Sequence, residues 1–158
     1  MVGEEKFRKA MGHFATGVTV VTARDGDGRP VGLTVNAFTS VSLDPPLILV
    51  CIHKKAESHE PILESGFFAV NILSRDQETL AITFARGEAS KRFENLEIFD
   101  GPKGCPLLPG VLAWLECRVH RVYPGGDHSI IVAEVLECEG LGGEALGFLR
   151  GELGGVGP

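Results

Sequence analysis

A chain of 158 residues, of which 44% are hydrophobic, is long enough for one domain with a full core that needs no metal or disulfide. Its net charge of −6 argues against general nucleic-acid binding, which requires a basic surface, but permits a local basic pocket for a small anion. The length predicts one domain over residues 1–158. No apolar run approaches the roughly 20 residues that span a bilayer, so we expect no membrane partner.

The cysteines and the N-terminal segment bear on the cellular compartment. The four cysteines, Cys51, Cys105, Cys117 and Cys138, form no CxxC pair, and no histidine stands at a zinc-site spacing from them. The charged N-terminal segment lacks the apolar core of a signal peptide. We therefore expect a cytoplasmic protein with reduced thiols and no metal site.

The first third of the chain predicts one helix and three strands. Apolar residues at helical spacing predict a helix over residues 4–15. β-Branched residues predict a strand over 19–23, and two Asp-Gly pairs then form a hairpin loop into a second strand, 31–42. The prolines after Asp44 end that strand, because proline cannot donate to a central ladder. The third strand, 47–52, is continuously apolar, as expected where both faces are covered.

The rest of the chain continues as strands with few helices. Ser58 is placed to cap a short helix running to Glu64, and Ser74 with Gln77 forms a capping box that predicts a helix over 75–85. Further strands are predicted over 67–73, 111–123 and 129–139. The glycine-rich tail from residue 142 is expected to be loosely ordered at its end. Because the strands follow one another mostly through short turns, we predict a mainly β protein with a closed antiparallel sheet and peripheral helices.

The predicted strand 31–42 is unusually polar. Alternation places one set of side chains on one face, namely Thr34, Asn36, Ser40 and Ser42. The other face carries Val35, Ala37, Thr39 and Val41. The polar face is explained either by exposure to solvent or by a flat ligand that small hydroxyl groups allow to approach closely. Asparagine is depleted from strands, which favours the ligand.

A basic loop follows the apolar strand. Lys54 or Lys55, the Ser58 hydroxyl and the N–H groups of a helix start together predict a phosphate site, because a helix N-terminus favours anions. The alternative is a solvated charged turn. Arg86, with Lys91 and Arg92, either completes the phosphate site or lies on an exposed helical face.

His128 stands at a strand start after a glycine turn, where it is the best single candidate for a polar contact to a second substrate. The alternative is an ordinary surface or core histidine. The chain has no GxGxxG, GxxxxGK[ST], GxSxG or HExxH motif, so the residues alone predict a β-rich domain with a planar, phosphate-bearing ligand.

Several segments, in order along nearly the whole chain, resemble the flavin reductase-like family, the reductase components of two-component flavin-dependent monooxygenases. These segments are FATGVTVVTA (14–23), GLTVNAFTSVSLDPPLILVCI (32–52), FAVNIL (68–73), LAITFA (80–85), GCPLLPGVLAWLECRV (104–119), GGDHSIIVAEV (125–135) and FLRG (148–151). The resemblance implies a split β-barrel of antiparallel, Greek-key type that binds FMN or FAD and forms a homodimer. It further implies reduction of flavin by NADH or NADPH, with transfer of reduced flavin to a partner oxygenase. A flavin-binding electron carrier without NAD(P)H turnover is the alternative.

The resemblance also implies roles for particular residues. The isoalloxazine and ribityl chain would be lined by Thr34, Val35, Asn36, Ala37, Ser40, Val41 and Ser42. The ribityl end and phosphate would be held by Cys51, Ile52, His53, Lys54 and Ser58, with Arg86 nearby. His128 would face the nicotinamide, and the Cys51 thiol is not expected to be redox-active. Glu152 and Leu153 follow the FLRG segment where many family members carry an aromatic residue, so the nicotinamide preference stays open.

Overall fold

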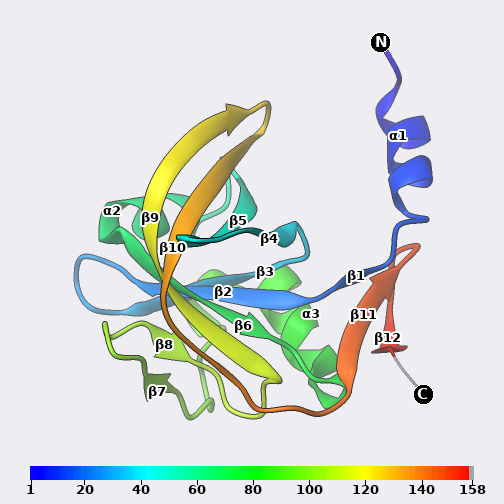
Figure 1. Cartoon of the computed structure of the whole chain (residues 1–158). Helices are drawn as coiled ribbons and strands as arrows, with labels where there is room; N and C mark the ends of the chain where they lie inside the picture. The colour runs from blue at the N-terminus through cyan, green and yellow to red at the C-terminus, as the bar shows by residue number, and fades with distance from the viewer. Residues whose placement is uncertain (157–158) are drawn as a thin grey trace.

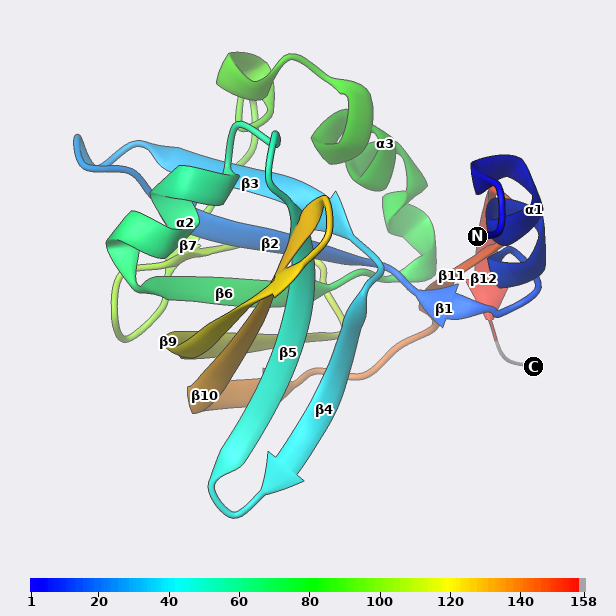
Figure 2. The same cartoon turned by 90° about the horizontal axis from the view of Figure 1, so that it is seen from above.

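The protein is built on a curved antiparallel sheet of seven strands, which a computed structural model describes together with the rest of residues 1–156 (Figures 1 and 2). The strands are β2 (Thr19–Arg24), β3 (Pro30–Val35), β4 (Phe38–Leu43), β5 (Pro46–His53), β6 (Phe67–Ile72), β9 (Ala113–Gly125) and β10 (His128–Gly140). Their order across the sheet is β3-β2-β6-β9-β10-β5-β4, so the early strand β5 pairs with the late strand β10. The predicted antiparallel β architecture is confirmed.

Two smaller sheets flank the large one. β1 (Thr16–Gly17), β11 (Ala145–Leu149) and β12 (Glu152–Val156) form a three-stranded sheet, and β7 (Phe99–Asp100) pairs with β8 (Pro106–Leu107). β11 and β12 are joined by Arg150 and Gly151, whose φ angles of 52° and 79° are those of a type I′ hairpin turn. The glycine-rich segment is therefore a hairpin up to residue 156, and the loose order expected at its very end stays a prediction. Residues 157–158 lie outside the described part of the chain.

Three α-helices surround the sheets (Figure 1): α1 (Glu4–Met11), α2 (His59–Ser65) and α3 (Glu78–Arg86). A 3₁₀ turn at Arg75–Gln77 leads into α3, and the Gln77 side chain accepts a hydrogen bond from the N–H of Ser74, as a capping box requires. A second 3₁₀ turn spans Ala89–Lys91. The first helix ends at Met11 rather than at residue 15, and none of its side chains is buried in this single chain.

The apolar core has two main parts, to both of which β2 contributes, and a third, smaller cluster of Ala69, Cys105 and Leu107. One part fills the barrel interior, where Val21 meets Val50 and Ile52 of β5. The other lies between the sheet, α3 and β11, where Val20 meets Phe84 and Leu146. β5 alternates in burial, because the side chains of Ile48, Val50 and Ile52 enter the core while the residues between them face outward.

The predicted strand over residues 31–42 is wrong as a single element. It is two strands, β3 and β4, which lie at opposite edges of the seven-stranded sheet. The chain turns at Asn36, whose carbonyl accepts from the N–H of Phe38, while the carbonyl of Ala37 accepts from the N–H of Cys51. The change of pairing partner, from β2 to β5, therefore takes place at Asn36 and Ala37, and it ends the alternation on which the predicted polar face depended.

Candidate functional site

Two hollows, of about 580 and 1310 Å³, adjoin one another on the protein surface. Both are lined by Asn36 from the β3–β4 turn, and by Phe148 and Gly151 from the C-terminal hairpin. Ligand pockets commonly measure about 300–1000 Å³, so each hollow has room for a small molecule. We call them the α3 hollow and the N-terminal hollow, after the segments that close them.

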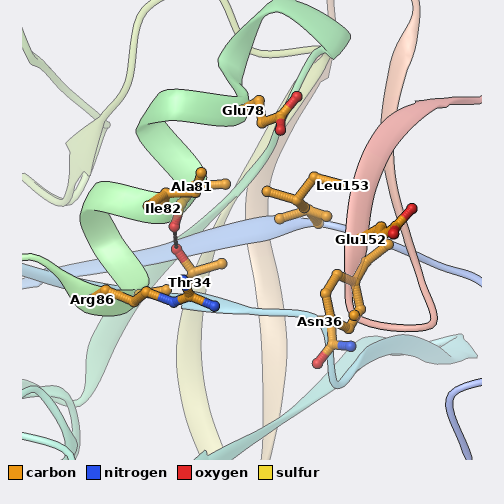
Figure 3. Close-up of a pocket in the computed structure, with 12 residues that line it drawn as sticks. Thr34, Asn36, Glu78, Ala81, Ile82, Arg86, Glu152 and Leu153 are labelled. Atoms are coloured by element: carbon orange, nitrogen blue, oxygen red, sulfur yellow. Dashed lines mark hydrogen bonds between the residues drawn. The ribbon is translucent and has the colours of Figure 1, made fainter.

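The α3 hollow lies between α3, the end of β3 and the C-terminal strand β12 (Figure 3). The Thr34 hydroxyl donates to the carbonyl of Ala81 at 2.6 Å, which fixes β3 against α3. The side chain of Leu153 enters from β12, and Arg86 supplies the positive charge of the hollow. The carboxylates of Glu78 and Glu152 also line the hollow, so its wall is partly apolar and carries charges of both signs, with the Arg86 guanidinium as its group for an anion.

The N-terminal hollow is larger and more cationic. Its walls are the outward face of β5, the start of β4, the tip of the C-terminal hairpin and the segment between α1 and β1. The basic side chains that line it are Arg8, Lys9, His13 and Arg150. Arg150 is held in place by a backbone bond to the carbonyl of Gly12 at 2.9 Å, so the N- and C-terminal segments are bound to one another at this wall.

Thr16, in the wall of the N-terminal hollow, has an unpaired side chain. Its side chain lines the hollow, yet its hydroxyl oxygen is buried and has no hydrogen-bond partner among residues 1–156. Buried polar groups in native proteins are almost always paired, and each exception requires an explanation. Because this oxygen is buried, it lies behind the surface of the hollow, and the polar side chain that lines the same wall is that of Asn36.

A third group of polar residues lies where β5 ends beside the start of β10. His53 and His128 are direct partners in the antiparallel register, and their rings meet edge to face at a centroid distance of 5.0 Å. The Asp127 carboxylate accepts from Nδ1 of His128 at 2.7 Å. Lys54 adjoins this group, and its N–H donates to the carbonyl of Asp127. Leu49 and Cys51 line the N-terminal hollow, and His53 is the next residue on the same face of β5, but neither His53 nor His128 lines either hollow. We call the residues beyond that end of the hollow the rim group.

The structure brings many of the predicted residues together, but in separate places. Thr34, Asn36 and Arg86 line the α3 hollow, and Asn36, Ala37 and Cys51 line the N-terminal hollow. His53, Lys54 and His128 form the rim group. Ser40, Val41 and Ser42 line neither hollow, because they belong to β4 beyond its contact with the site. The predicted face is corrected accordingly: Thr39, assigned to the opposite face, lines the N-terminal hollow.

Three predicted residues have buried side chains. Val35 and Ile52 pack in the barrel core, so only their backbone groups are available to a ligand. Ser58 precedes α2 as predicted, but its hydroxyl does not cap the helix; it donates instead to the carbonyl of Gly32 at 3.2 Å. Arg92 donates to that same carbonyl at 2.8 Å. The predicted capping by Ser58 is therefore wrong, because the hydroxyl already has a partner inside the fold.

Cys51 differs from a reactive cysteine. Partial burial raises the pKa of its thiol, which keeps the sulfur protonated and weakly nucleophilic. All four cysteines are free thiols. Within residues 1–156 there is no group of three or more histidine, cysteine, aspartate or glutamate side chains arranged to hold a metal ion.

Sequence reasoning missed several residues of the site. Phe148 and Gly151 line both hollows, and Thr16 lines the larger one. In the sequence, these residues were marked only because they lie in the FATG and FLRG segments of the family resemblance. Neither segment shows a residue pattern that by itself indicates a ligand. Among the described residues, no helix is long and apolar enough to cross a membrane.

Comparison with known proteins decides the family. Residues 11–157 match the flavin reductase like domain, which is nearly the whole chain. The chain belongs to the flavin reductase-like family. This membership confirms the resemblance on which the sequence expectations were based.

Three relatives illustrate the range of the flavin reductase-like family. The chain is 46% identical, over 91% of its length, to the reductase subunit of stachydrine N-demethylase from Rhizobium meliloti (strain 1021), of which it covers 62%. It is 45% identical, over 94% of its length, to the FMN reductase (NADH) of Agrobacterium fabrum, of which it covers 83%. The solved NADH:FAD oxidoreductase of Streptomyces globisporus, in complex with NAD and FAD fragments, is 38% identical with a TM-score of 0.91, over 100% of this chain and 97% of that chain.

The likeness in structure confirms the split-barrel fold. The relatives in this family differ in length. This chain spans 46% of another Rhizobium meliloti relative, in addition to 62% of the stachydrine N-demethylase subunit, so several relatives are substantially longer than the segment shared with it.

Proposed function

We propose that the chain is an NAD(P)H-dependent flavin reductase that reduces FMN or FAD by hydride transfer and supplies the reduced flavin to a partner monooxygenase. The observation that carries the proposal is the pair of adjoining hollows that share Asn36, because the reaction needs two planar ligands in contact. The names of the relatives, an FMN reductase (NADH) and a reductase subunit of a demethylase, support the same activity.

When both are bound, the flavin and the nicotinamide supply the chemistry, which is transfer of a hydride from one ring to the other. The protein holds and orients the two rings and excludes water. Asn36 and Ala37 stand where the first ring would lie, and the small Ala37 side chain leaves one ring face open. Arg86 supplies positive charge for a phosphate at the α3 end. We expect His128, which pairs with His53 where β10 begins, to contact the nicotinamide.

The site residues that we propose for flavin are those that line the hollows, namely Thr34, Asn36, Ala37, Cys51 and Arg86. Lys54, in the rim group, is proposed as a second phosphate contact. Backbone groups of Val35, Ile52 and the Ser58 turn complete this assignment.

The deciding experiment measures NADH and NADPH oxidation by the purified protein with and without added FMN or FAD. We expect oxidation that requires flavin and that prefers one of the two nucleotides. Flavin binding without oxidation of either nucleotide would contradict the reductase proposal and indicate an electron carrier. Addition of cytochrome c or another acceptor distinguishes reduced flavin that leaves the protein from flavin that stays bound.

We also infer that the chain forms a homodimer. Helix α1 exposes Phe7 and Met11, Phe14 is 70% exposed beside it, and Leu43 on the edge strand β4 is 95% exposed. Exposed apolar groups of this kind are typical of an interface. A second copy is also supported by the N-terminal hollow, which at about 1310 Å³ is larger than most ligand pockets. Analytical ultracentrifugation of the wild type and of Phe14→Asp tests it, with a monomeric wild type as the contradicting result.

A cytoplasmic location is proposed on the free thiols, which reducing compartments preserve.

A further inference from the structure

The two hollows differ in the charge of their walls. Among residues 1–156, no aspartate or glutamate lines the N-terminal hollow, although the chain has 21 acidic residues and only 15 lysines and arginines. The α3 hollow, in contrast, is lined by the carboxylates of Glu78 and Glu152 beside Arg86. A cleft whose walls carry one sign of charge concentrates ligands of the opposite sign. The N-terminal hollow is therefore the better place in this molecule for a ligand with several negative charges.

Two of the basic side chains in that wall have a structural explanation. Arg8 and Lys9 lie in the last turn of α1, where the negative end of the helix dipole favours cations. Arg8 also forms an ion pair with Glu4 at 2.7 Å. Arg150 has no such explanation, because it lies in the turn between β11 and β12 and its guanidinium forms no ion pair within residues 1–156.

Arg150 is held in one orientation beside the N-terminal segment. Figure 2 shows β11 and β12 next to α1, at one side of the barrel. The backbone N–H of Arg150 donates to the carbonyl of Gly12 at 2.9 Å, and its Nε donates to Nδ1 of His13 in a long hydrogen bond of 3.4 Å. The two terminal nitrogens of the guanidinium have no hydrogen-bond partner within residues 1–156. A pair of parallel N–H donors matches two oxygens of a phosphate group.

We propose that Arg150 binds the diphosphate bridge of a dinucleotide in the N-terminal hollow. The inference rests on the proposed reductase function, in which two ligands carry this group, the nicotinamide nucleotide and FAD, whereas FMN does not. Gly151, the next residue, lines both hollows, so Arg150 borders the wall at which the two rings would meet. The absence of carboxylates from the hollow keeps the attraction of this guanidinium for the two phosphates uncompensated.

The first test measures KM with FMN as the flavin, so that only the nicotinamide nucleotide carries a diphosphate. Arg150→Gln removes the charge and keeps a polar side chain. The control is Arg29→Gln in the exposed loop between β2 and β3, which lines neither hollow. We expect Arg150→Gln to raise the KM for NADH about tenfold. The KM for N-benzyl-dihydronicotinamide, which has the reacting ring but no phosphate, should stay as in wild type.

Arg150→Lys should recover only part of the loss, because it restores the charge without the two parallel donors. The Tm of each variant should stay within about two degrees of wild type, since an exposed side chain contributes little to stability. Equal rises in KM for NADH and for the phosphate-free reductant, or an equal rise in Arg29→Gln, would overturn the proposal.

A second test does not depend on activity. ADP carries a diphosphate without a nicotinamide or flavin ring, and isothermal titration calorimetry measures its binding. We expect wild type and Arg29→Gln to bind ADP, and Arg150→Gln to bind it about tenfold more weakly. No binding of ADP by wild type, or equal affinity in Arg150→Gln, contradicts the inference.

Titrations of FAD and FMN identify which dinucleotide supplies the diphosphate. Weaker binding of FAD by Arg150→Gln, with unchanged FMN affinity and unchanged KM for NADH, assigns the diphosphate to the flavin. A raised KM for NADH with unchanged affinity for both flavins assigns it to the nicotinamide nucleotide. If wild type oxidises neither NADH nor NADPH with any flavin, the proposed function fails, and the binding of ADP decides the inference separately.

Discussion

Asn36 and Phe148, from opposite ends of the chain, line the same two hollows. Asn36 lies in the turn where the chain leaves β3 for β4, and Phe148 lies on β11 opposite Thr16. Both residues belong to the wall that the two hollows share. They are therefore the most direct targets for testing whether the two hollows act as one site.

Asn36→Ala is expected to weaken FMN binding about tenfold, since the variant loses polar contacts to the ring without opening a core cavity. The free energy of unfolding should change by less than about 0.5 kcal/mol. Fluorescence titration of FMN measures the affinity. Ser40→Ala is the control, because Ser40 lies on β4 away from both hollows. An equal loss of FMN affinity in Ser40→Ala would contradict this assignment and would support the single polar face predicted from the sequence, which the structure divides between β3 and β4.

Arg86→Ala should weaken FMN about tenfold and riboflavin hardly at all, because only FMN has a phosphate for the guanidinium. Parallel titrations of the two flavins measure the difference. Lys54→Ala tests the other candidate end of the site. If Lys54→Ala weakens FMN binding but not riboflavin binding, and Arg86→Ala weakens neither, the phosphate binds at the rim group and not in the α3 hollow.

Thr16→Val should raise the free energy of unfolding by about 1 kcal/mol, because the hydroxyl is buried without a partner and valine has the same shape. Thr22→Val, on the next strand along the chain, is the matched control. Its hydroxyl donates to the carbonyl of Pro106 and accepts from Asn71, so its loss should cost about 2 kcal/mol. Urea unfolding without ligand measures both. Destabilisation by Thr16→Val would show that the hydroxyl has a partner in solution.

The buried cysteines should make the protein sensitive to alkali. Burial raises the pKa of the Cys105 and Cys117 thiols to about 12, and the charge of Glu116 is the second cause. An unfolded cysteine loses its proton near pH 8.5, so above that pH the unfolded chain binds fewer protons than the native one. Stability is therefore complete below about pH 8 and falls as the pH rises toward 12.

Urea midpoints between about pH 8 and pH 10 measure this fall. Cys117→Ala should flatten the pH dependence, while Cys138→Ala, at an exposed position, should leave it as in wild type. The same slope in all three proteins would contradict the assignment to the buried thiols.

The sequence was informative wherever local pattern and tertiary environment agree. The continuous apolar run of β5 identified that strand, although the expectation that both its faces are covered is wrong, since its residues alternate in burial. The apolar run of β6 identified the next strand, and the capping box at Ser74 identified the helix that follows. The break at Asn36 escaped detection because no glycine or proline marks it. The turn is produced by a change of pairing partner, which is a tertiary event. Alternation was therefore continued across a point where it had ceased, and Ser40 was placed beside Thr34.

The site was harder to predict than the fold. The sequence identified Arg86, Asn36 and His128 as chemically suitable residues. It did not predict how they are distributed between the two hollows and the rim group. Phe148 and Gly151 were missed because a glycine-rich tail resembles a disordered end, whereas the I′ turn at Arg150 and Gly151 makes it a hairpin. Ser58 was misjudged because its real partner, the carbonyl of Gly32, is distant in sequence.

The contribution of both chain ends to the site has a consequence for synthesis on the ribosome. The barrel strands from β2 to β10 are complete once residue 140 has emerged, and the core has then most of its members. Neither hollow has all its walls until Gly151 has also left the exit tunnel and paired back onto the segment around Gly12. A nascent chain can therefore hold a folded barrel before it has a place for its ligand, and ligand binding reports that translation has passed the hairpin.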